Sequence, residues 1–208
     1  MTRSVRKYPS GEQVAEAASS ALIIRLNELL SKQQTVHLSI TGGTVGILTL
    51  VKLAENQART SVDWARVHIW WGDERFVARD SADRNANQAR NALLNYIEVP
   101  ESNIHEFPSS DSHTLDSALA SFSATVESFI PNGLHFIPFD ITLLGMGPDG
   151  HIASLFPGKP EIESGLSVVS EADSPKPPPQ RLSFTYEAIN SSSEVWFLIA
   201  GADKAEPV

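Results

Sequence analysis

Three strand-like segments of this chain each run directly into a turn that contains glycine and polar residues. Residues 36–40, 67–71 and 141–144 are strongly apolar, and the turns that follow them read TGGTVG, GDER and GMGPDG. Stretches with helical periodicity separate the three segments. This alternation predicts an α/β fold with an open, mostly parallel sheet and helices on both faces. Ligands bind beyond the carboxyl ends of the strands in such a sheet, so we expect the functional site at these turns.

Helical periodicity accounts for much of the remaining chain. Ser10 and Gln13 have the spacing of a capping box, and apolar residues recur behind them every three or four positions. Further helices are expected over residues 47–54, 85–97 and 115–130, a last strand over 195–200, and the start of a helix within 202–206.

The last expected strand is followed by few residues. After residue 200 the chain reads GADKAEPV, which is enough for hardly one helical turn. Because a buried parallel strand needs cover on both faces, we expect residues 1–208 to be one α/β domain that lacks its last C-terminal segment.

Composition excludes several classes of function. No apolar run approaches the ~20 residues of a membrane span, and the polar, basic start does not resemble a secretory signal. The chain has no cysteine, which excludes disulfides, thiolate metal ligands and a cysteine nucleophile and fits a reducing compartment. We therefore expect a cytoplasmic protein.

The formal net charge of −9 disfavours binding to nucleic acid or to an anionic membrane. The same charge repels any anionic small molecule at long range. A substrate that carries a phosphate would therefore have to be held by local cations and backbone N–H groups.

The first glycine turn has the features of a phosphate-binding loop. Glycines between a strand and a helix let the backbone approach a phosphate, and the helix N-terminus supplies N–H donors. Thr41, Gly42, Gly43 and Thr44 are the candidate ligands. The loop is neither a Walker A motif nor a dinucleotide fingerprint, and a plain tight turn is an equally good interpretation of these residues taken alone.

The second turn places Asp73, Glu74 and Arg75 together after a strand. A short acidic and basic run is usually an exposed cluster whose charges compensate each other. Its position at a strand end favours a functional role for Asp73 and Arg75.

The third turn, with the residues that follow it, is the most specific motif. Residues 145–158 read GMGPDGHIASLFPG and display Asp149 and His151 on a glycine-rich loop. A lone histidine is more often structural, but this position and a pKa near neutrality suit a general base or acid. A metal site is disfavoured because the pair has no evident third ligand.

Two single cations complete the candidate set. Arg181 follows the SPKPPP tract, and Lys204 lies in the expected first turn of the last helix. A surface role is the default for either residue. A lysine at a helix N-terminus opposes the helix dipole, however, and a bound anion would remove that conflict.

Four long motifs together resemble the 6-phosphogluconolactonases of the glucosamine-6-phosphate isomerase/6-phosphogluconolactonase family. They read WWGDERFV with RNANQAR, then ITLLGMGPDGHIASLFPG, SPKPPPQRLSF and WFLIAGADKA, in order from about residue 36 to the end. The resemblance implies a Rossmann-like α/β fold and hydrolysis of 6-phosphogluconolactone in the oxidative pentose phosphate pathway. It also implies that His151 is the catalytic base, that Arg75 lies in the substrate pocket, and that the glycine loop, Arg181 and Lys204 hold the phosphate.

The chain departs from the family pattern in two places. The glycine loop usually reads like Ser-Gly-Gly-Ser-Thr-Pro, whereas Val45 and Gly46 replace its last two residues here. Val45 is thereby excluded from a phosphate-binding role. Family members also usually continue some tens of residues beyond the GADK stretch, in agreement with the missing segment expected above.

These observations favour a lactonase that needs no cofactor, metal or obligate protein partner. His151 would take a proton from water, the water would attack the lactone carbonyl, and the imidazolium would then protonate the leaving ring oxygen. Arg75 or loop N–H groups could stabilise the oxyanion, and Asp149 or Asp73 could orient the imidazole. The alternatives are a glucosamine-6-phosphate deaminase or isomerase of the same fold and a noncatalytic sugar-phosphate sensor.

Overall fold

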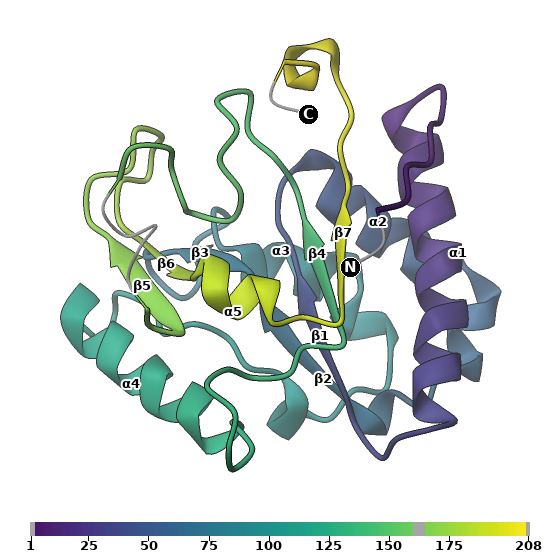
Figure 1. The fold of residues 1–208 in the computed structure, drawn as a ribbon, viewed down its shortest axis with the longest axis horizontal. Coiled ribbons are helices and arrows are strands. Elements are labelled where there is room, and N and C mark those ends of the chain that lie inside the picture. Colours follow the sequence, from purple (N-terminus) through teal and green to yellow (C-terminus); the bar gives the residue numbers. More distant parts are fainter. Residues whose placement is uncertain (1–2, 160–164, 207–208) are drawn as a thin grey trace.

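A computed structural model describes residues 3–159 and 165–206. Its centre is a four-stranded, wholly parallel sheet in the order β2-β1-β4-β7 (Figure 1). The strands are β1 (Val36–Ile40), β2 (Val67–Trp71), β4 (Ile141–Leu144) and β7 (Glu194–Phe197). The parallel sheet confirms the fold class expected from the alternating pattern. Because the strands are parallel, the turns after β1, β2 and β4 meet at one edge.

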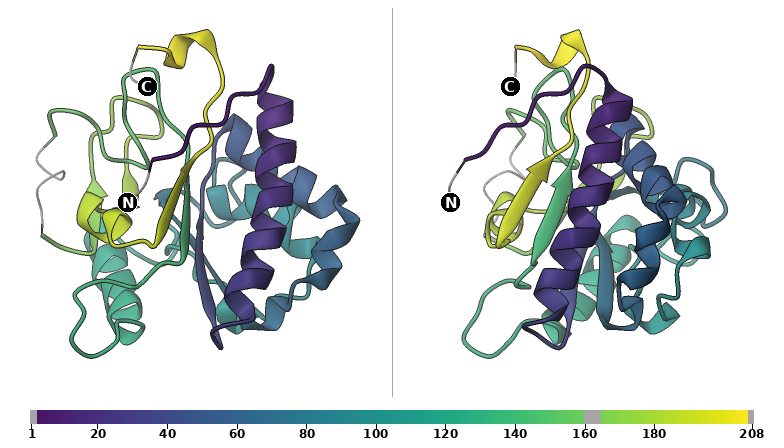
Figure 2. Two further views of the ribbon diagram at one scale, coloured as in Figure 1. Left: turned by 45° about the vertical axis from the view of Figure 1, so that its right-hand side comes forward. Right: turned by 90° about the vertical axis from the view of Figure 1, so that its right-hand side faces the viewer.

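Helices cover both faces of this sheet (Figures 1 and 2). The packed pair α1 and α2 lies on one side, and α4 lies on the other. The helices are α1 (Gly11–Leu30), α2 (Thr44–Glu55), α3 (Asn85–Ala92), α4 (Leu115–Ser128) and α5 (Tyr186–Asn190). Short 3₁₀ turns span Gln57–Ser61, Trp64–Arg66, Leu94–Tyr96, Glu101–Asn103 and Ala202–Lys204. The expected cap of α1 is present, since the Ser10 hydroxyl accepts the N–H of Gln13 at 3.2 Å.

A second sheet of three antiparallel strands was not expected from the sequence. Its order is β3-β6-β5, with β3 (Asp73–Arg75), β5 (Val168–Glu171) and β6 (Arg181–Phe184). The sheet packs beside α4, and Phe184 of β6 meets Trp70 of β2 with ring centroids 6.4 Å apart. The charged turn after β2 is therefore a strand of this second sheet.

Three expected boundaries were wrong. The helix predicted to reach residue 97 ends at Ala92, because Leu93 leaves helical geometry and thereby buries both itself and Leu94. The last strand ends at Phe197 rather than residue 200. Lys204 lies in a 3₁₀ turn of three residues, not in an α-helix.

Within the described ranges, no helix is both long and apolar enough to cross a membrane.

Three histidines stack in the core between the sheet and α4. The rings of His37 and His68 lie 4.9 Å apart, His68 Nδ1 and His105 Nε2 share a hydrogen bond of 2.9 Å, and His105 stacks on Trp70 at 3.9 Å. Burial, aided by the neighbouring histidines, lowers the pKa of His37 and of His105 to about 4. Burial also lowers the pKa of His68. All three rings are therefore neutral in the folded protein at neutral pH.

This stack predicts a loss of stability in mild acid. The unfolded chain binds protons below about pH 6.5, whereas the folded rings resist them until about pH 4. The contribution of the rings to the unfolding free energy is thus present above pH 6.5 and lost as the pH falls towards 4. The double variant His68→Phe/His105→Phe replaces both partners of the ring–ring hydrogen bond, so urea unfolding should show a shallower decline between pH 7 and pH 5. His135→Gln, at an exposed position, is the control, and equal slopes in all three proteins would contradict the prediction.

Candidate active site

The glycine loop forms the start of α2 at the edge where the parallel strands end. Gly43 is the N-cap residue and Thr44 the first residue of the helix, so the first free N–H groups of α2 belong to this loop. No side chain caps these N–H groups. The Thr41 hydroxyl faces the other glycine loop and accepts the N–H of Gly145 at 3.4 Å. The arrangement offers N–H donors to an anion, which is the geometry expected of a phosphate-binding loop.

The charged turn after β2 is buried, so its interpretation as an exposed cluster was wrong. The side chains of Asp73 and Glu74 are almost fully enclosed. Strand β3 pairs with β6 in a register that places Arg75 directly opposite Arg181. Two residues predicted to hold an anionic substrate, far apart in the sequence, are thus neighbours across one strand pair.

Asp73 is the centre of a buried polar cluster. Its Oδ2 accepts a hydrogen bond of 2.6 Å from Ser154 Oγ and lies 3.9 Å from Arg181 Nη1. Its negative charge also raises the pKa of His151, although burial has the larger, opposite effect on that ring. Asp73 therefore connects the β3–β6 strand pair with the histidine loop.

Asp149 and His151 form a close pair on the loop after β4. His151 Nδ1 lies 2.5 Å from Asp149 Oδ1, and the imidazole packs against Phe156 with ring centroids 4.6 Å apart. Gly147 is required here, because a Cβ at that position would lie 2.0 Å from His151 Nδ1. The backbone closes the loop, since the N–H of Gly147 donates to the His151 carbonyl at 2.8 Å.

The pair fixes the tautomer of the imidazole. Although burial opposes ionisation, hydrogen bonds from His151 and Lys176 lower the pKa of Asp149 to about 2. This carboxylate is therefore charged and can only accept hydrogen bonds. Nδ1 of His151 must then carry the proton, and Nε2 keeps the lone pair. Burial lowers the pKa of His151, so the ring is neutral at neutral pH. Among the described residues nothing bonds to Nε2, which is therefore available as a base.

Lys176 was missed by sequence reasoning. Its Nζ lies 3.0 Å from Asp149 Oδ1 and 3.3 Å from His151 Nδ1. Because both Nδ1–H and the ammonium are donors, they do not bond to each other, and both point at the same carboxylate. The residue belongs to the SPKPPP tract, where a lysine between prolines gave no sign of a partner 27 residues earlier in the sequence.

Arg181 positions that tract. Its guanidinium donates to the carbonyls of Lys176, Pro177 and Pro178 at 3.1 to 3.3 Å. Most of its donors are therefore occupied by the backbone that carries Lys176. Nη1, 3.9 Å from Asp73 Oδ2, is the atom best placed to reach a substrate. The predicted contact of Arg181 with phosphate remains a prediction.

Lys204 pairs with its neighbour in the sequence. Its Nζ is 3.3 Å from Asp203 Oδ2, and the residue lines a cavity of about 320 Å³ together with Ser10 and Gly11 at the start of α1. In the described part of the chain, no hydrogen bond or ion pair joins Lys204 to Arg181, His151 or the glycine loop. Its predicted role in phosphate binding also remains a prediction.

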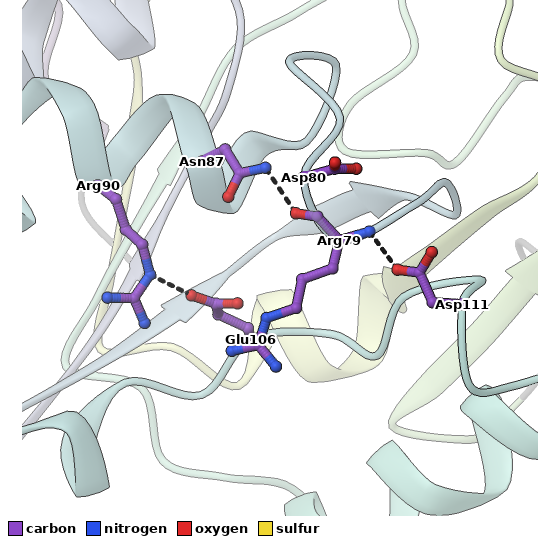
Figure 3. Close-up of a pocket in the computed structure, with 6 residues that line it drawn as sticks. All are labelled: Arg79, Asp80, Asn87, Arg90, Glu106 and Asp111. Carbon is purple, nitrogen blue, oxygen red and sulfur yellow. Dashed lines mark hydrogen bonds and ion pairs between the residues drawn. The ribbon is translucent and has the colours of Figure 1, made fainter.

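A larger cavity of about 560 Å³ lies away from all the predicted site residues (Figure 3). Its lining is Arg79, Asp80, Asn87, Arg90, Glu106 and Asp111. Part of this charge is already bound, since Arg90 Nε donates to Glu106 at 2.6 Å and the Asp111 carboxylate accepts the backbone N–H of Arg79. The cavity therefore offers less for an anionic substrate than the strand ends do. Over residues 3–159 and 165–206 no three His, Asp or Glu side chains come together as metal ligands.

The sequence profile of glucosamine-6-phosphate isomerases and 6-phosphogluconolactonases matches residues 9–208. The chain belongs to this family. A 6-phosphogluconolactonase of Mycobacterium tuberculosis is 38% identical over 212 residues, which span 100% of this chain and 85% of that protein. One of Streptomyces coelicolor is 38% identical over 203 residues, or 95% of this chain and 78% of that one. The solved 6-phosphogluconolactonase of Thermotoga maritima aligns with a TM-score of 0.81 at 27% identity, covering 92% of this chain and 82% of the other.

The contacts around His151 predict opposite pKa shifts in two variants. Asp149→Asn removes the carboxylate that stabilises the imidazolium and should lower the pKa of His151. Lys176→Gln removes a cation that destabilises it and should raise that pKa. Histidine Cε1–H resonances followed by NMR during a pH titration measure both shifts, with exposed His135 as the internal control. Shifts of the same sign in the two variants would contradict this geometry.

Proposed function

We propose that this chain hydrolyses 6-phospho-D-glucono-1,5-lactone to 6-phosphogluconate, with His151 as the general base. The observation that carries the mechanism is the 2.5 Å contact between His151 Nδ1 and Asp149, which leaves Nε2 unprotonated and, among residues 3–159 and 165–206, without a hydrogen bond. Membership of the family and full-length similarity to proteins named 6-phosphogluconolactonase support the reaction.

The reaction needs one group that serves first as a base and then as an acid. Nε2 of His151 takes a proton from water while the water oxygen attacks the lactone carbonyl carbon. The tetrahedral intermediate collapses, the bond from this carbon to the ring oxygen breaks, and the imidazolium returns the proton to that oxygen. The charged Asp149 stabilises the imidazolium between the two steps.

The proposed binding groups surround the histidine loop. The N–H groups of Gly43 and Thr44 at the start of α2 favour a phosphate, and Arg75 on β3 adds positive charge together with Arg181, its partner on β6. Lys176, 3.0 Å from Asp149, adds a cation beside the base. Arg75, Lys176 and loop N–H groups are the candidate donors to the oxyanion.

The proposal covers residues 1–208 as one catalytic α/β domain that acts on a small sugar-phosphate lactone. The net charge of −9 argues against nucleic acid as a ligand. The cytoplasm is the proposed location, since a chain without cysteine fits a reducing compartment.

A paired assay tests the reaction class. The purified protein should hydrolyse the lactone faster than the spontaneous rate in the same buffer, and it should release no ammonia from glucosamine 6-phosphate. Ammonia release without lactonase activity would assign the chain to the deaminase branch of the family.

The role of His151 predicts a large loss of turnover with retained binding. Removal of a general base costs roughly 10²–10⁴-fold in rate, so His151→Ala should lose most of kcat while still binding 6-phosphogluconate. His151→Asn should be similarly slow, because an amide can orient water but cannot take its proton. The kcat/KM of the unaltered protein should fall on the acid side as His151 becomes protonated.

Rates in this test are corrected for spontaneous hydrolysis, which rises with pH. His113→Ala, outside the proposed site, is the matched histidine control. A fall of less than about threefold in the corrected kcat of a folded His151→Ala protein would be far smaller than the loss expected for a general base. Such a result would transfer the role to Asp73 or Asp149.

A further inference from the structure

Asn85 is buried where α3 meets two segments that carry predicted site residues, the glycine loop and β3. It is the first residue of α3 and is only 2% exposed. Its Oδ1 accepts a hydrogen bond of 2.5 Å from Arg75 Nη1, and its Nδ2 donates to the Asp73 carbonyl at 2.8 Å. The mechanism proposed above gives this side chain no role.

The orientation of the Asn85 amide is unambiguous. An arginine only donates and a carbonyl only accepts, so the amide oxygen must face Arg75 and the amide nitrogen must face Asp73. The Asp83 carbonyl accepts from the same Nη1 at 3.0 Å. These two acceptors, two residues apart on the segment that leads into α3, therefore fix this end of the Arg75 guanidinium.

Gly42 of the phosphate-binding loop lies against the same amide. A Cβ at position 42 would lie 2.1 Å from Asn85 Oδ1, so only glycine allows this approach. Asn85 thus separates the glycine loop from the Arg75 guanidinium by the width of one amide group.

Glu74 holds the backbone of Asn85 in place. Its carboxylate accepts the N–H of Asn85 at 2.7 Å and that of Ala86 at 2.9 Å. It thereby caps the helix, because the side chain of the N-cap residue Arg84 does not. A carboxylate at a helix N-terminus is favourable. The Arg84 guanidinium lies 3.9 Å away, and both side chains are 1% exposed. The start of α3 is therefore fixed by two backbone hydrogen bonds to the buried Glu74 side chain.

We propose that Asn85 is a positioning residue, which sets the Arg75 guanidinium at a fixed distance from the glycine loop so that both act on one anionic substrate. The inference rests on the proposed function. Asn85 does not touch the reacting atoms and acts through Arg75. Misplacement of a binding group by about 1 Å can cost up to about 10²-fold in rate.

Asn87 provides a matched control on the same helix. Its amide donates to the carbonyls of Arg79 and Ser81 at 2.7 and 2.8 Å, beside the cavity of Figure 3. Asn87→Ala therefore removes an amide with two similar hydrogen bonds but leaves Arg75 and Gly42 untouched.

A double-mutant cycle with Arg75 tests the proposal. Asn85→Ala should lower kcat/KM by about tenfold or more in the otherwise unaltered protein, but by less than about twofold in an Arg75→Ala background, where nothing remains to be positioned. Asn87→Ala should have the same small effect in both backgrounds. Equal losses from Asn85→Ala in the two backgrounds would overturn the proposal. If Asn85→Ala does not fold, Asn85→Ser, whose hydroxyl is too short to reach Arg75, takes its place.

A second cycle tests the contact with the glycine loop. Gly42→Ala should be strongly damaging on its own, because its Cβ collides with Asn85 Oδ1. In an Asn85→Ala background that space is open, so Gly42→Ala should add little. An equal loss in both backgrounds would contradict the contact.

These cycles separate the inference from the proposed function. Lactone hydrolysis by the unaltered protein decides the function by itself. Should that activity be absent, both cycles are measured on the free energy of unfolding in urea. The effect of Asn85→Ala should then depend on Arg75 and on Gly42. The effect of Asn87→Ala should depend on neither residue. Additive effects on the free energy of unfolding would then overturn the proposed positioning role of Asn85.

Discussion

The pairing of β3 with β6 places two guanidinium groups opposite each other, and the site is built around that contact. Like charges directly opposed across a strand pair are unfavourable, and burial increases the cost. Arg75 and Arg181 are nevertheless accommodated, because each is bound by acceptors from elsewhere. Arg181 is held by three carbonyls of the proline tract, and Arg75 by Asn85 and the Asp83 carbonyl. The loops that satisfy the two arginines are thereby fixed in position.

The parallel sheet and its glycine turns could be predicted because their signals are local. β1, β2 and β4 have the expected bounds, and α1 begins after its predicted cap at Ser10. Since parallel strands end at one edge, the sequence also predicted that the three turns meet there. The sequence left open whether Asp149 or Asp73 orients the imidazole, and the structure pairs His151 with Asp149.

The second sheet could not be predicted, because its strands have only three or four residues and one of them is entirely charged. A run of Asp73, Glu74 and Arg75 looks exposed when its partners are unknown. Glu74 is buried because the first turn of α3 supplies N–H donors, and Lys176 reaches Asp149 because Arg181 binds the carbonyls around it. Contacts of this kind join residues 5 to 27 positions apart and leave no periodic pattern in the sequence.

The charge of the site also bears on release of the product. Under the proposed reaction a lactone becomes a carboxylate, so the product carries one more negative charge than the substrate. Asp149, whose pKa is held at about 2, is ionised at every pH where the histidine is neutral, and the net charge of the chain is −9. Both repel the new carboxylate, although solvent screens the exposed Asp149 and the Lys176 ammonium lies 3.0 Å from its Oδ1. The phosphate is common to substrate and product, so the cations that bind it do not distinguish the two. The carboxylate that orients the base therefore also disfavours retention of the product.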